Sequence, residues 1–317
     1  MAHIFGPVPS RRLGRSLGVD LVPPKTCTYD CLYCEVGPTT HLTLKRRAYR
    51  VEEILRELKG YLEHPSQPLD FITLTGSGEP TLNLGLNEVI GAVKALTGVK
   101  VAVLTNGSLL YREEVRREIR GADVILPSLD AGREETFRRL NRPHPRLSLA
   151  LLVSGLKALR REFSGAVWLE VMLLKGLNDG EEELTALRDL LRQISPDLVQ
   201  LNTAVRPVAD SQAQALDLAE MEAIAGFLGP GVEVVAQPPA ERALPGEITD
   251  EEVLQMVARR PMTARDLALA LGKPLKQVDR ILGHLVSHGR LAREVHQGQD
   301  FYRSFPAFRS KEMNLHI

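Results

Sequence analysis

The chain has 317 residues, of which 44% are apolar and 25% charged, an ordinary balance for a globular protein with a normal core. Lys plus Arg and Asp plus Glu both number 40, so no global field favours nucleic acid or an anionic membrane as a partner. No apolar run is long enough to cross a bilayer, and the first residues lack the apolar stretch of a signal peptide, so we expect a cytoplasmic protein.

Strand-like and helix-like segments alternate along residues 16–203. The expected strands are short and almost continuously apolar, at residues 16–22, 69–75, 99–105, 123–129, 166–174 and 197–203. The expected helices lie near residues 51–63, 86–96, 111–120, 147–162 and 181–193. Apolar strands alternating with helices are typical of a parallel sheet with right-handed crossovers. Six such units predict an α/β fold, a partial (β/α)6 TIM-like barrel, with a Rossmann-type open sheet as the competing architecture.

The end of the chain has a different rhythm. Residues 237–248 are rich in Pro and Gly and are predicted to be a linker. Three short helices and a β-hairpin with a turn near Gln297 follow, a pattern typical of a small winged helix-turn-helix domain. We therefore expect a barrel domain at 1–236, a winged-helix domain at 249–305 and a tail at 306–317.

The chain has only three cysteines, Cys27, Cys31 and Cys34, with the spacing C-x3-C-x2-C. An odd number of cysteines within eight residues is not a disulfide framework and indicates a reduced compartment. Three thiolates can hold three corners of a four-iron cluster and leave the fourth iron open to a small molecule. The alternative is a structural zinc site with His41 as the fourth ligand, although zinc ligands more often come as two separated pairs.

Residues 27–34, with Tyr33 directly before the third cysteine, resemble the signature of the radical S-adenosylmethionine (SAM) superfamily. The strand–helix order of residues 5–235 is also similar to that family, most of all to the broad group that includes wyosine-type tRNA-modifying enzymes. The resemblance implies a [4Fe–4S] cluster whose open iron chelates the amino and carboxylate groups of SAM. Reductive cleavage of SAM would then give a 5′-deoxyadenosyl radical that abstracts hydrogen from a substrate.

The resemblance also implies SAM-binding residues after the expected second strand. Gly76, Ser77, Gly78 and Glu79 look like the family's Gly-Gly-Glu element, with Ser77 in place of a glycine. In that interpretation Gly78 and Glu79 contact the SAM amino group. The alternative is a plain turn with Glu79 near a helix N-terminus, where a carboxylate is favourable.

Other candidates end later strands. Asn106, Ser128 and Asp130 could bond ribose hydroxyls or the SAM carboxylate, but Asn-Gly and Asp are also ordinary turn residues. Lys175 could hold the SAM carboxylate. Glu170, Asn202 and Arg206 lie on the side that related enzymes often use for adenine, ribose or substrate, although Arg206 could equally pair with a surface carboxylate. No residue can be assigned a catalytic role from the sequence.

Basic residues flank the first strand and the cysteine segment: Arg11, Arg12, Arg15, Lys45, Arg46, Arg47 and Arg50. They could attract a phosphate-bearing substrate or the SAM carboxylate, or form a solvated face. The helix expected to read DNA carries Lys276 and Arg280 but also Asp279, which gives weak support for DNA binding.

Three functions remain open. The first is a radical SAM enzyme with a reductant such as a flavodoxin or ferredoxin and a tRNA or protein as candidate substrate. Because all cysteines are used for one cluster, an auxiliary cluster and a methylated cysteine are disfavoured. The second is an iron–sulfur sensor that regulates transcription through a DNA-binding winged helix, and the third is a zinc-stabilised α/β binding protein.

Overall fold

The computed structural model describes residues 3–63, 68–235 and 248–304. Its main feature is an eight-stranded sheet with the strand order β1-β2-β5-β6-β7-β8-β9-β10. The strands are β1 (Ile4–Ser10), β2 (Gly14–Asp20), β5 (Phe71–Thr75), β6 (Lys100–Thr105), β7 (Val124–Pro127), β8 (Ala166–Leu173), β9 (Leu198–Thr203) and β10 (Val232–Val234). All neighbours are parallel except β1 and β2, which form an antiparallel hairpin.

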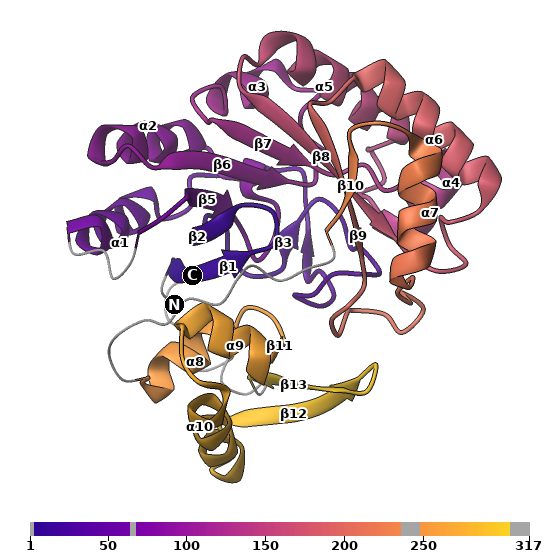
Figure 1. The fold of residues 1–317 in the computed structure, drawn as a ribbon. Coiled ribbons are helices and arrows are strands. Elements are labelled where there is room, and N and C mark those ends of the chain that lie inside the picture. The colour runs from indigo at the N-terminus through magenta and orange to yellow at the C-terminus, as the bar shows by residue number, and fades with distance from the viewer. Residues whose placement is uncertain (1–2, 64–67, 236–247, 305–317) are drawn as a thin grey trace.

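Helices cover the outer face of this curved sheet (Figure 1). They are α1 (Val51–Glu63), α2 (Leu86–Leu96), α3 (Glu113–Glu118), α4 (Glu134–Asn141), α5 (Leu149–Glu162), α6 (Glu181–Ile194) and α7 (Leu218–Leu228). Alternate strand residues, such as Leu17 and Ile72, pack against the helices in the main core. The residues between them point inward, where Phe71 and Leu126 form a smaller cluster with Trp168.

The predicted α/β fold with a mostly parallel sheet is confirmed, and the sheet does not close. Its ends are β1 and β10, which are not neighbours in the strand order. Both of these strands were missed in the sequence, and the first predicted strand, 16–22, is observed as β2 from Gly14 to Asp20. Gly6, Pro7 and Pro9 argue against a strand, but an edge strand tolerates proline.

Two helices were also missed. α7 begins with a capping box, in which Asp217 accepts from the Glu220 amide and Glu220 accepts in return from the Asp217 amide. This D-x-x-E signal is visible in the sequence. The short α4 has no equivalent signal, because Arg133 at its N-cap makes no side-chain cap.

Residues 248–304, here called the C-terminal unit, form a second small core. Three helices, α8 (Asp250–Val257), α9 (Ala264–Leu271) and α10 (Leu275–Ser287), pack through residues such as Val253, Leu267 and Leu282. A three-stranded antiparallel sheet contains β11 (Met262–Thr263), β13 (Gln299–Ser304) and β12 (Leu291–His296). The predicted helices and hairpin are present, with positive φ at Gln297 and Gly298 in the turn. The predicted tail 306–317 and all of the predicted linker except Ile248 lie outside the described residues.

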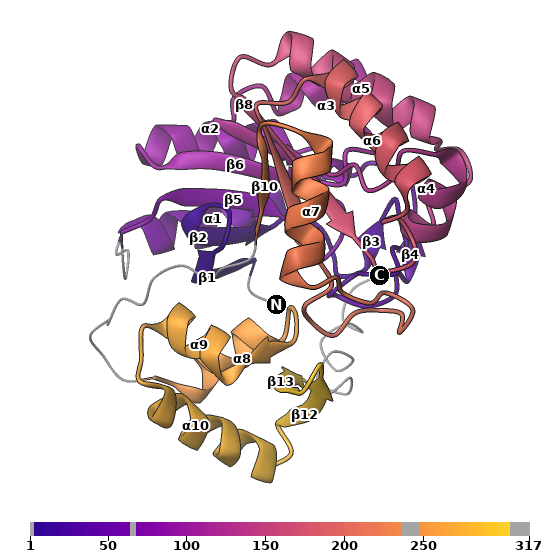
Figure 2. The ribbon, with the colours of Figure 1, turned by 45° about the vertical axis from the view of Figure 1, so that its right-hand side comes forward.

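The C-terminal unit packs against β1, on the side of the sheet away from α1–α7 (Figures 1 and 2). Val8 of β1 joins the core of the unit. The Arg259 guanidinium lies 4.2 Å from the centre of the Phe5 ring, a cation–π distance. Phe5 in turn lies so close to Gly18 that a Cβ there would be 2.1 Å from the ring. None of the described helices is long and apolar enough to span a membrane.

Candidate functional site

The three cysteines lie on one loop beyond the carboxyl end of β2. Cys27 is in the short strand β3 (Thr26–Cys27), which pairs with β4 (His41–Leu42), and Cys31 and Cys34 follow in the loop. All three thiols are free and half-buried. Within the described part of the chain, no three His, Cys, Asp or Glu side chains are placed to share one metal ion. In a cubane each thiolate binds its own iron, so such a cluster needs no common point.

Two asparagine side chains direct their amide groups at the sulfur atoms. Asn106 Nδ2 lies 3.6 Å from Cys27 Sγ, and Asn141 Nδ2 lies 3.7 Å from Cys31 Sγ. Hydrogen bonds to cluster sulfur are one way in which proteins tune an iron–sulfur site. Asn106 was a candidate from the sequence for another role, whereas Asn141 was missed because it ends the unpredicted helix α4.

Burial raises the pKa of the thiols. The pKa of Cys27 rises to about 12, chiefly because burial disfavours the thiolate, and that of Cys31 is raised for the same reason. Burial also raises the pKa of Cys34, although Lys25 opposes this. A metal that binds here must displace these protons, as thiolate sites generally require. Three free thiols with amide donors beside them are a donor set that fits an iron–sulfur cluster.

The loop of Gly76 to Glu79 is fastened to the backbone of the cysteine loop. The Glu79 amide donates to the Thr26 carbonyl at 3.0 Å, and the Lys25 amide donates to the Ser77 carbonyl at 2.7 Å. A Cβ at Gly78 would lie 1.9 Å from the Thr26 carbonyl oxygen, so only glycine permits this approach.

Asp20, at the end of β2, explains the serine in this loop. Its carboxylate accepts from the Ser77 amide at 2.9 Å and from the Ser77 hydroxyl at 2.6 Å. Both residues are buried, so these bonds hold the loop against the sheet. Asp20 was missed from the sequence because a buried strand-end aspartate gives no signal until its partner is known.

Glu79 is buried, and its carboxylate accepts four hydrogen bonds. Oε1 accepts from the Thr81 amide, the Thr81 hydroxyl and the Thr105 hydroxyl at 2.6–3.0 Å. Oε2 accepts from the Asn106 amide at 2.8 Å. Glu79 thus caps the 3-10 helix Pro80–Leu82, as the turn interpretation expects. Among the described residues Oε2 accepts this one bond, so it keeps capacity for another donor. Burial raises the pKa of this carboxyl.

A second polar network surrounds Asp130. Tyr33 donates its hydroxyl to Asp130, and Asn141 Nδ2 lies 2.8 Å from the same carboxylate oxygen. The Met172 amide donates to the other oxygen at 2.9 Å. Burial raises the pKa of Asp130 to about 6, although these hydrogen bonds oppose the rise. Two sequence candidates, Tyr33 and Asp130, are therefore brought together beside the cysteine loop. Asn141 Oδ1 is buried with no partner in the described residues.

The candidates Ser128, Lys175 and His41 make no side-chain hydrogen bond to this centre among the described contacts. Ser128 is half-buried and forms a bridge with Glu170 of β8. Lys175 is half exposed and pairs with Glu220 of α7 at 2.6 Å. Among the described contacts it makes no hydrogen bond to the cysteine loop. His41, the alternative zinc ligand, is exposed on β4.

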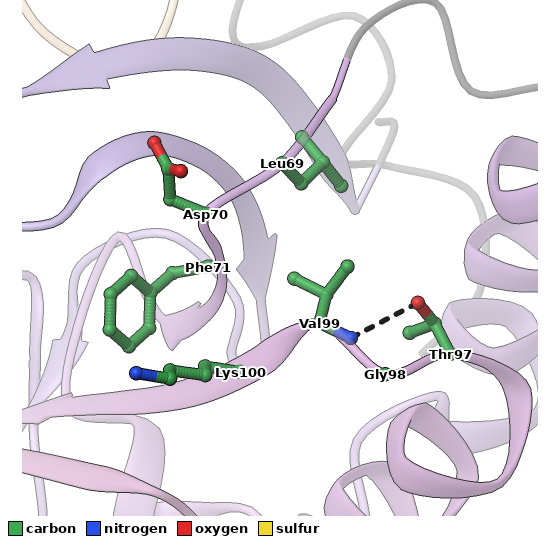
Figure 3. Close-up of a pocket in the computed structure, with 7 residues that line it drawn as sticks. All are labelled: Leu69, Asp70, Phe71, Thr97, Gly98, Val99 and Lys100. Atoms are coloured by element: carbon green, nitrogen blue, oxygen red, sulfur yellow. Dashed lines mark hydrogen bonds between the residues drawn. The ribbon is translucent and has the colours of Figure 1, made fainter.

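A pocket of about 560 Å³ lies at the amino ends of the strands, opposite the cysteine loop (Figure 3). It is lined by Leu69, Asp70, Phe71, Thr97, Gly98, Val99 and Lys100. These residues lie at the amino ends of β5 and β6, whereas sites in α/β sheets form at the carboxyl ends. The Val99 amide bonds the Thr97 hydroxyl at 3.2 Å, so this is an ordinary helix-to-strand turn. We assign it no role.

Residues 21–188 match the radical SAM superfamily, whose members use a [4Fe–4S] cluster and SAM. A UPF0026 protein of Helicobacter pylori (strain J99) is 33% identical over 287 residues, covering 89% of this chain and 92% of that protein. A UPF0026 protein of Methanocaldococcus jannaschii is 29% identical and covers 99% of both. A protein of Brachyspira hyodysenteriae named GTPase Obg is 38% identical over 301 residues, but this chain spans only 44% of its length.

Two solved structures share the fold. One is TYW1 with a lysine-pyruvate adduct bound, with a TM-score of 0.51 and 20% identity, covering 71% of this chain and 75% of that one. The other is a radical SAM methyltransferase from Sphaerobacter thermophilus, with a TM-score of 0.52 and 19% identity, covering 69% and 66%. At these identities the similarity concerns the fold alone.

Proposed function

Because this chain belongs to the radical SAM superfamily and to the UPF0026 proteins, we propose that it is an enzyme that cleaves SAM reductively. In this proposal Cys27, Cys31 and Cys34 hold the [4Fe–4S] cluster. The cluster and SAM together supply one-electron chemistry that generates a hydrogen-abstracting radical from SAM. The protein binds and orients the reactants and excludes water.

The observation that carries the proposal is the cysteine loop itself. Its three free thiols stand at the carboxyl edge of a parallel sheet, and amides of Asn106 and Asn141 are directed at two of them. No fourth cysteine exists in the sequence. The donor set therefore leaves one corner of a cluster for a small molecule.

We assign SAM to the surface formed by Gly76, Gly78, Glu79 and Asn106. The free capacity of Glu79 Oε2 suits an ammonium group, because a carboxylate–ammonium hydrogen bond is stronger than a neutral one. Tyr33, Ser128 and Asp130 would bind the ribose or the carboxylate end. Lys175 is the weakest member of this set, since Glu220 already neutralises its charge.

We propose further that the C-terminal unit is a winged helix. The order α8, β11, α9, α10, β12, β13, with a hairpin after the third helix, supports this assignment. The corresponding domains are 1–236 and 249–305. α9 faces β1, whereas α10 exposes Lys276, Asp279 and Arg280. The mixed charge on α10 argues against tight binding of DNA, and we propose that this unit docks the substrate or a partner.

The test is anaerobic reconstitution with iron and sulfide, followed by incubation with SAM and dithionite. We expect a [4Fe–4S] absorption and electron paramagnetic resonance signal and release of 5′-deoxyadenosine. Cys31→Ala should lose both, whereas Cys31→Ser tests whether a weaker oxygen ligand retains part of the cluster. Normal 5′-deoxyadenosine release by Cys31→Ala would refute the ligand assignment.

The same experiment separates the enzyme from an iron–sulfur sensor. A sensor would hold the cluster and change its affinity for DNA with oxidation state, without cleaving SAM. Iron and zinc analysis of the purified protein tests the zinc alternative. A cluster that never yields 5′-deoxyadenosine would overturn the proposed activity and leave the cluster assignment intact.

A further inference from the structure

Four arginines meet on the open side of the sheet, and we call them the seam cluster: Arg11, Arg12, Arg206 and Arg260. The turn after β1 carries the first two across the opening. Arg11 Nη1 donates to the Val235 carbonyl at 3.2 Å, and its Nη2 donates to Asn202 Oδ1 at 3.4 Å. Arg12 pairs with Glu170 of β8. Among the described residues, side chains thus bridge the gap between β1 and the strands at the other end of the sheet.

The other two arginines connect the cysteine loop with the C-terminal unit through Glu35, the residue after Cys34. Glu35 Oε1 lies 3.5 Å from Arg206 Nη1, and Oε2 lies 3.4 Å from Arg260 Nη1. Arg206 also lies 3.4 Å from Asp266 of α9. The contacts of the four arginines, here called the network, thus form two groups. Glu35 joins the cysteine loop to α9 through Arg206 and Asp266.

The contacts of Arg11, Arg206 and Arg260 in this network are long. They measure 3.2–3.5 Å, whereas charge-assisted bonds are usually 2.7–2.9 Å. Other arginine–carboxylate pairs of the described residues range from 2.8 Å for Arg142–Asp210 to 3.9 Å for Arg192–Asp189. Arg11, Arg206 and Arg260 are therefore held loosely by their protein partners, whereas Arg12 makes a short ion pair with Glu170.

Buried polar atoms without a hydrogen-bond partner also indicate that the network can accept a ligand. Arg206 Nε and Gln200 Oε1 are buried and have no partner in the described residues. Gln200 lies on β9 opposite Glu170 of β8, next to the network. Arg11 has no carboxylate within 4.0 Å among the residues that the structure describes. Buried polar groups without partners are rare in native proteins, and a bound ligand is one reason for them.

The charge of the network identifies the ligand class. Its four guanidinium groups face three carboxylates, those of Glu35, Glu170 and Asp266, so one positive charge is left over. Repulsion from Arg206, together with burial, lowers the pKa of Arg260 to about 10. A guanidinium fork matches a carboxylate or phosphate in geometry as well as charge. A single excess charge in a half-buried site fits one oxyanion, not the long phosphate track of a nucleic acid.

We propose that the seam cluster binds a carboxylate or phosphate group of the substrate, with Arg11 and Arg206 as its principal donors. Glu35 directly follows Cys34, so the seam cluster lies next to the proposed iron–sulfur site. The assignment of the bound group to the substrate therefore rests on the proposed radical SAM activity. The C-terminal unit contributes Arg260 directly and orients Arg206 through Asp266. The bound group would thus be held jointly by both parts of the chain.

The test measures anion binding to the full-length, cluster-loaded protein by anaerobic isothermal titration calorimetry. The probes are inorganic phosphate and succinate, each at constant ionic strength in chloride. We expect one probe to bind with a Kd on the order of 1 mM, and the preferred probe distinguishes a phosphate from a carboxylate substrate. Arg11→Gln should weaken this binding at least about tenfold. Among the described residues no carboxylate lies within 4.0 Å of Arg11, and Glu35 keeps its pairs with Arg206 and Arg260 when Arg11 is replaced.

The matched control is Arg160→Gln, which removes a surface arginine that pairs with Asp197 at 3.1 Å. It should bind the probe as the unchanged protein does. Arg260→Gln should weaken binding and Arg260→Lys should restore part of it. Failure of both probes to bind at about 10 mM, or equal binding by Arg11→Gln and Arg160→Gln, would overturn the proposal. SAM cleavage is measured separately. Normal 5′-deoxyadenosine release without anion binding would therefore refute only the binding role of the seam cluster.

Discussion

At the scale of single residues, the site depends on how closely two backbone segments approach. Thr26, directly before Cys27, accepts a hydrogen bond from the Glu79 amide at 3.0 Å. The neighbouring Gly78 packs directly against the same Thr26 carbonyl. The loop proposed to bind SAM is thereby positioned by the same strand that carries the first cysteine. Adding one methyl group at Gly78 should therefore disturb both the loop proposed to bind SAM and the strand that carries Cys27.

We expect Gly78→Ala to destabilise the protein by about 2–4 kcal/mol, because the new Cβ would displace the Thr26 backbone and break buried hydrogen bonds. Urea unfolding measures this, and iron content after reconstitution should fall as well. Gly91→Ala is the control, since nothing lies within 4 Å of its Cβ and it sits in α2. There alanine should be neutral or stabilising by about 0.5–1 kcal/mol. Equal effects at both positions would contradict the close-approach argument.

Glu79 combines a structural and a proposed binding role, which one substitution can separate. Glu79→Ala leaves buried donors of Thr81, Thr105 and Asn106 without an acceptor, so it should cost about 2–4 kcal/mol of unfolding free energy. Glu79→Gln keeps one acceptor oxygen and should cost less, while it removes the charge that would face an ammonium group.

Affinity for SAM then gives the decisive measurement. Glu79→Gln should bind SAM about tenfold more weakly, equivalent to about 1.4 kcal/mol, with its iron content unchanged. An unchanged affinity would mean that Glu79 only caps the 3-10 helix.

At the scale of elements, α4 supports the cysteine loop. The Leu32 amide donates to the Leu140 carbonyl at 3.0 Å, and the Asp30 amide donates to the Asn141 carbonyl at 3.1 Å. Phe137 packs edge-on against Tyr29, with ring centres 5.5 Å apart. Tyr29 lies between the first two cysteines in the sequence, so a short helix sets the conformation of the loop.

Phe137→Ala should destabilise the protein by about 3–5 kcal/mol, because the ring is fully buried. It should also lower iron incorporation, since Tyr29 loses its packing partner. The control is Phe227→Ala, whose ring is 36% exposed and which lies on α7. Full iron incorporation by folded Phe137→Ala would show that the loop does not depend on α4.

At the scale of the whole molecule, the C-terminal unit is part of the folded body. It covers Phe5 and Val8 of β1 and supplies Arg260 to Glu35. Its hairpin turn also reaches the loop directly after β9, where Gln297 Nε2 donates to the Ala204 carbonyl at 3.4 Å. Removing the unit exposes apolar side chains and leaves Glu35 with fewer partners.

Truncation after residue 247 should therefore lower the melting temperature of the remaining chain and weaken any action on the substrate. SAM cleavage without substrate should persist, because the cysteine loop and the loop of Gly76 to Glu79 belong to residues 1–235. Circular dichroism melting and 5′-deoxyadenosine release provide the two measurements. A truncated chain that melts at the same temperature would show that the contact with β1 contributes nothing to stability.

The sequence by itself determined the features that depend on local chemistry. Apolar runs predicted the central parallel strands, and cysteine spacing placed the candidate cluster on one loop. Turn residues predicted the hairpin at Gln297. These signals need only neighbours along the chain, since backbone conformation, periodicity and donor type are all written within a few residues.

Only the tertiary structure decided how distant segments share the site. Asp20 with Ser77, Asn141 with Cys31, and Glu35 with Arg260 are separated by 57, 110 and 225 residues. Each is an ordinary polar residue until folding removes water and brings its partners within reach. The edge strand β1 could not be predicted for a different reason. Its prolines are tolerated only because one side of an edge strand makes no hydrogen bonds to a neighbouring strand, and its position at the edge is known only from the fold.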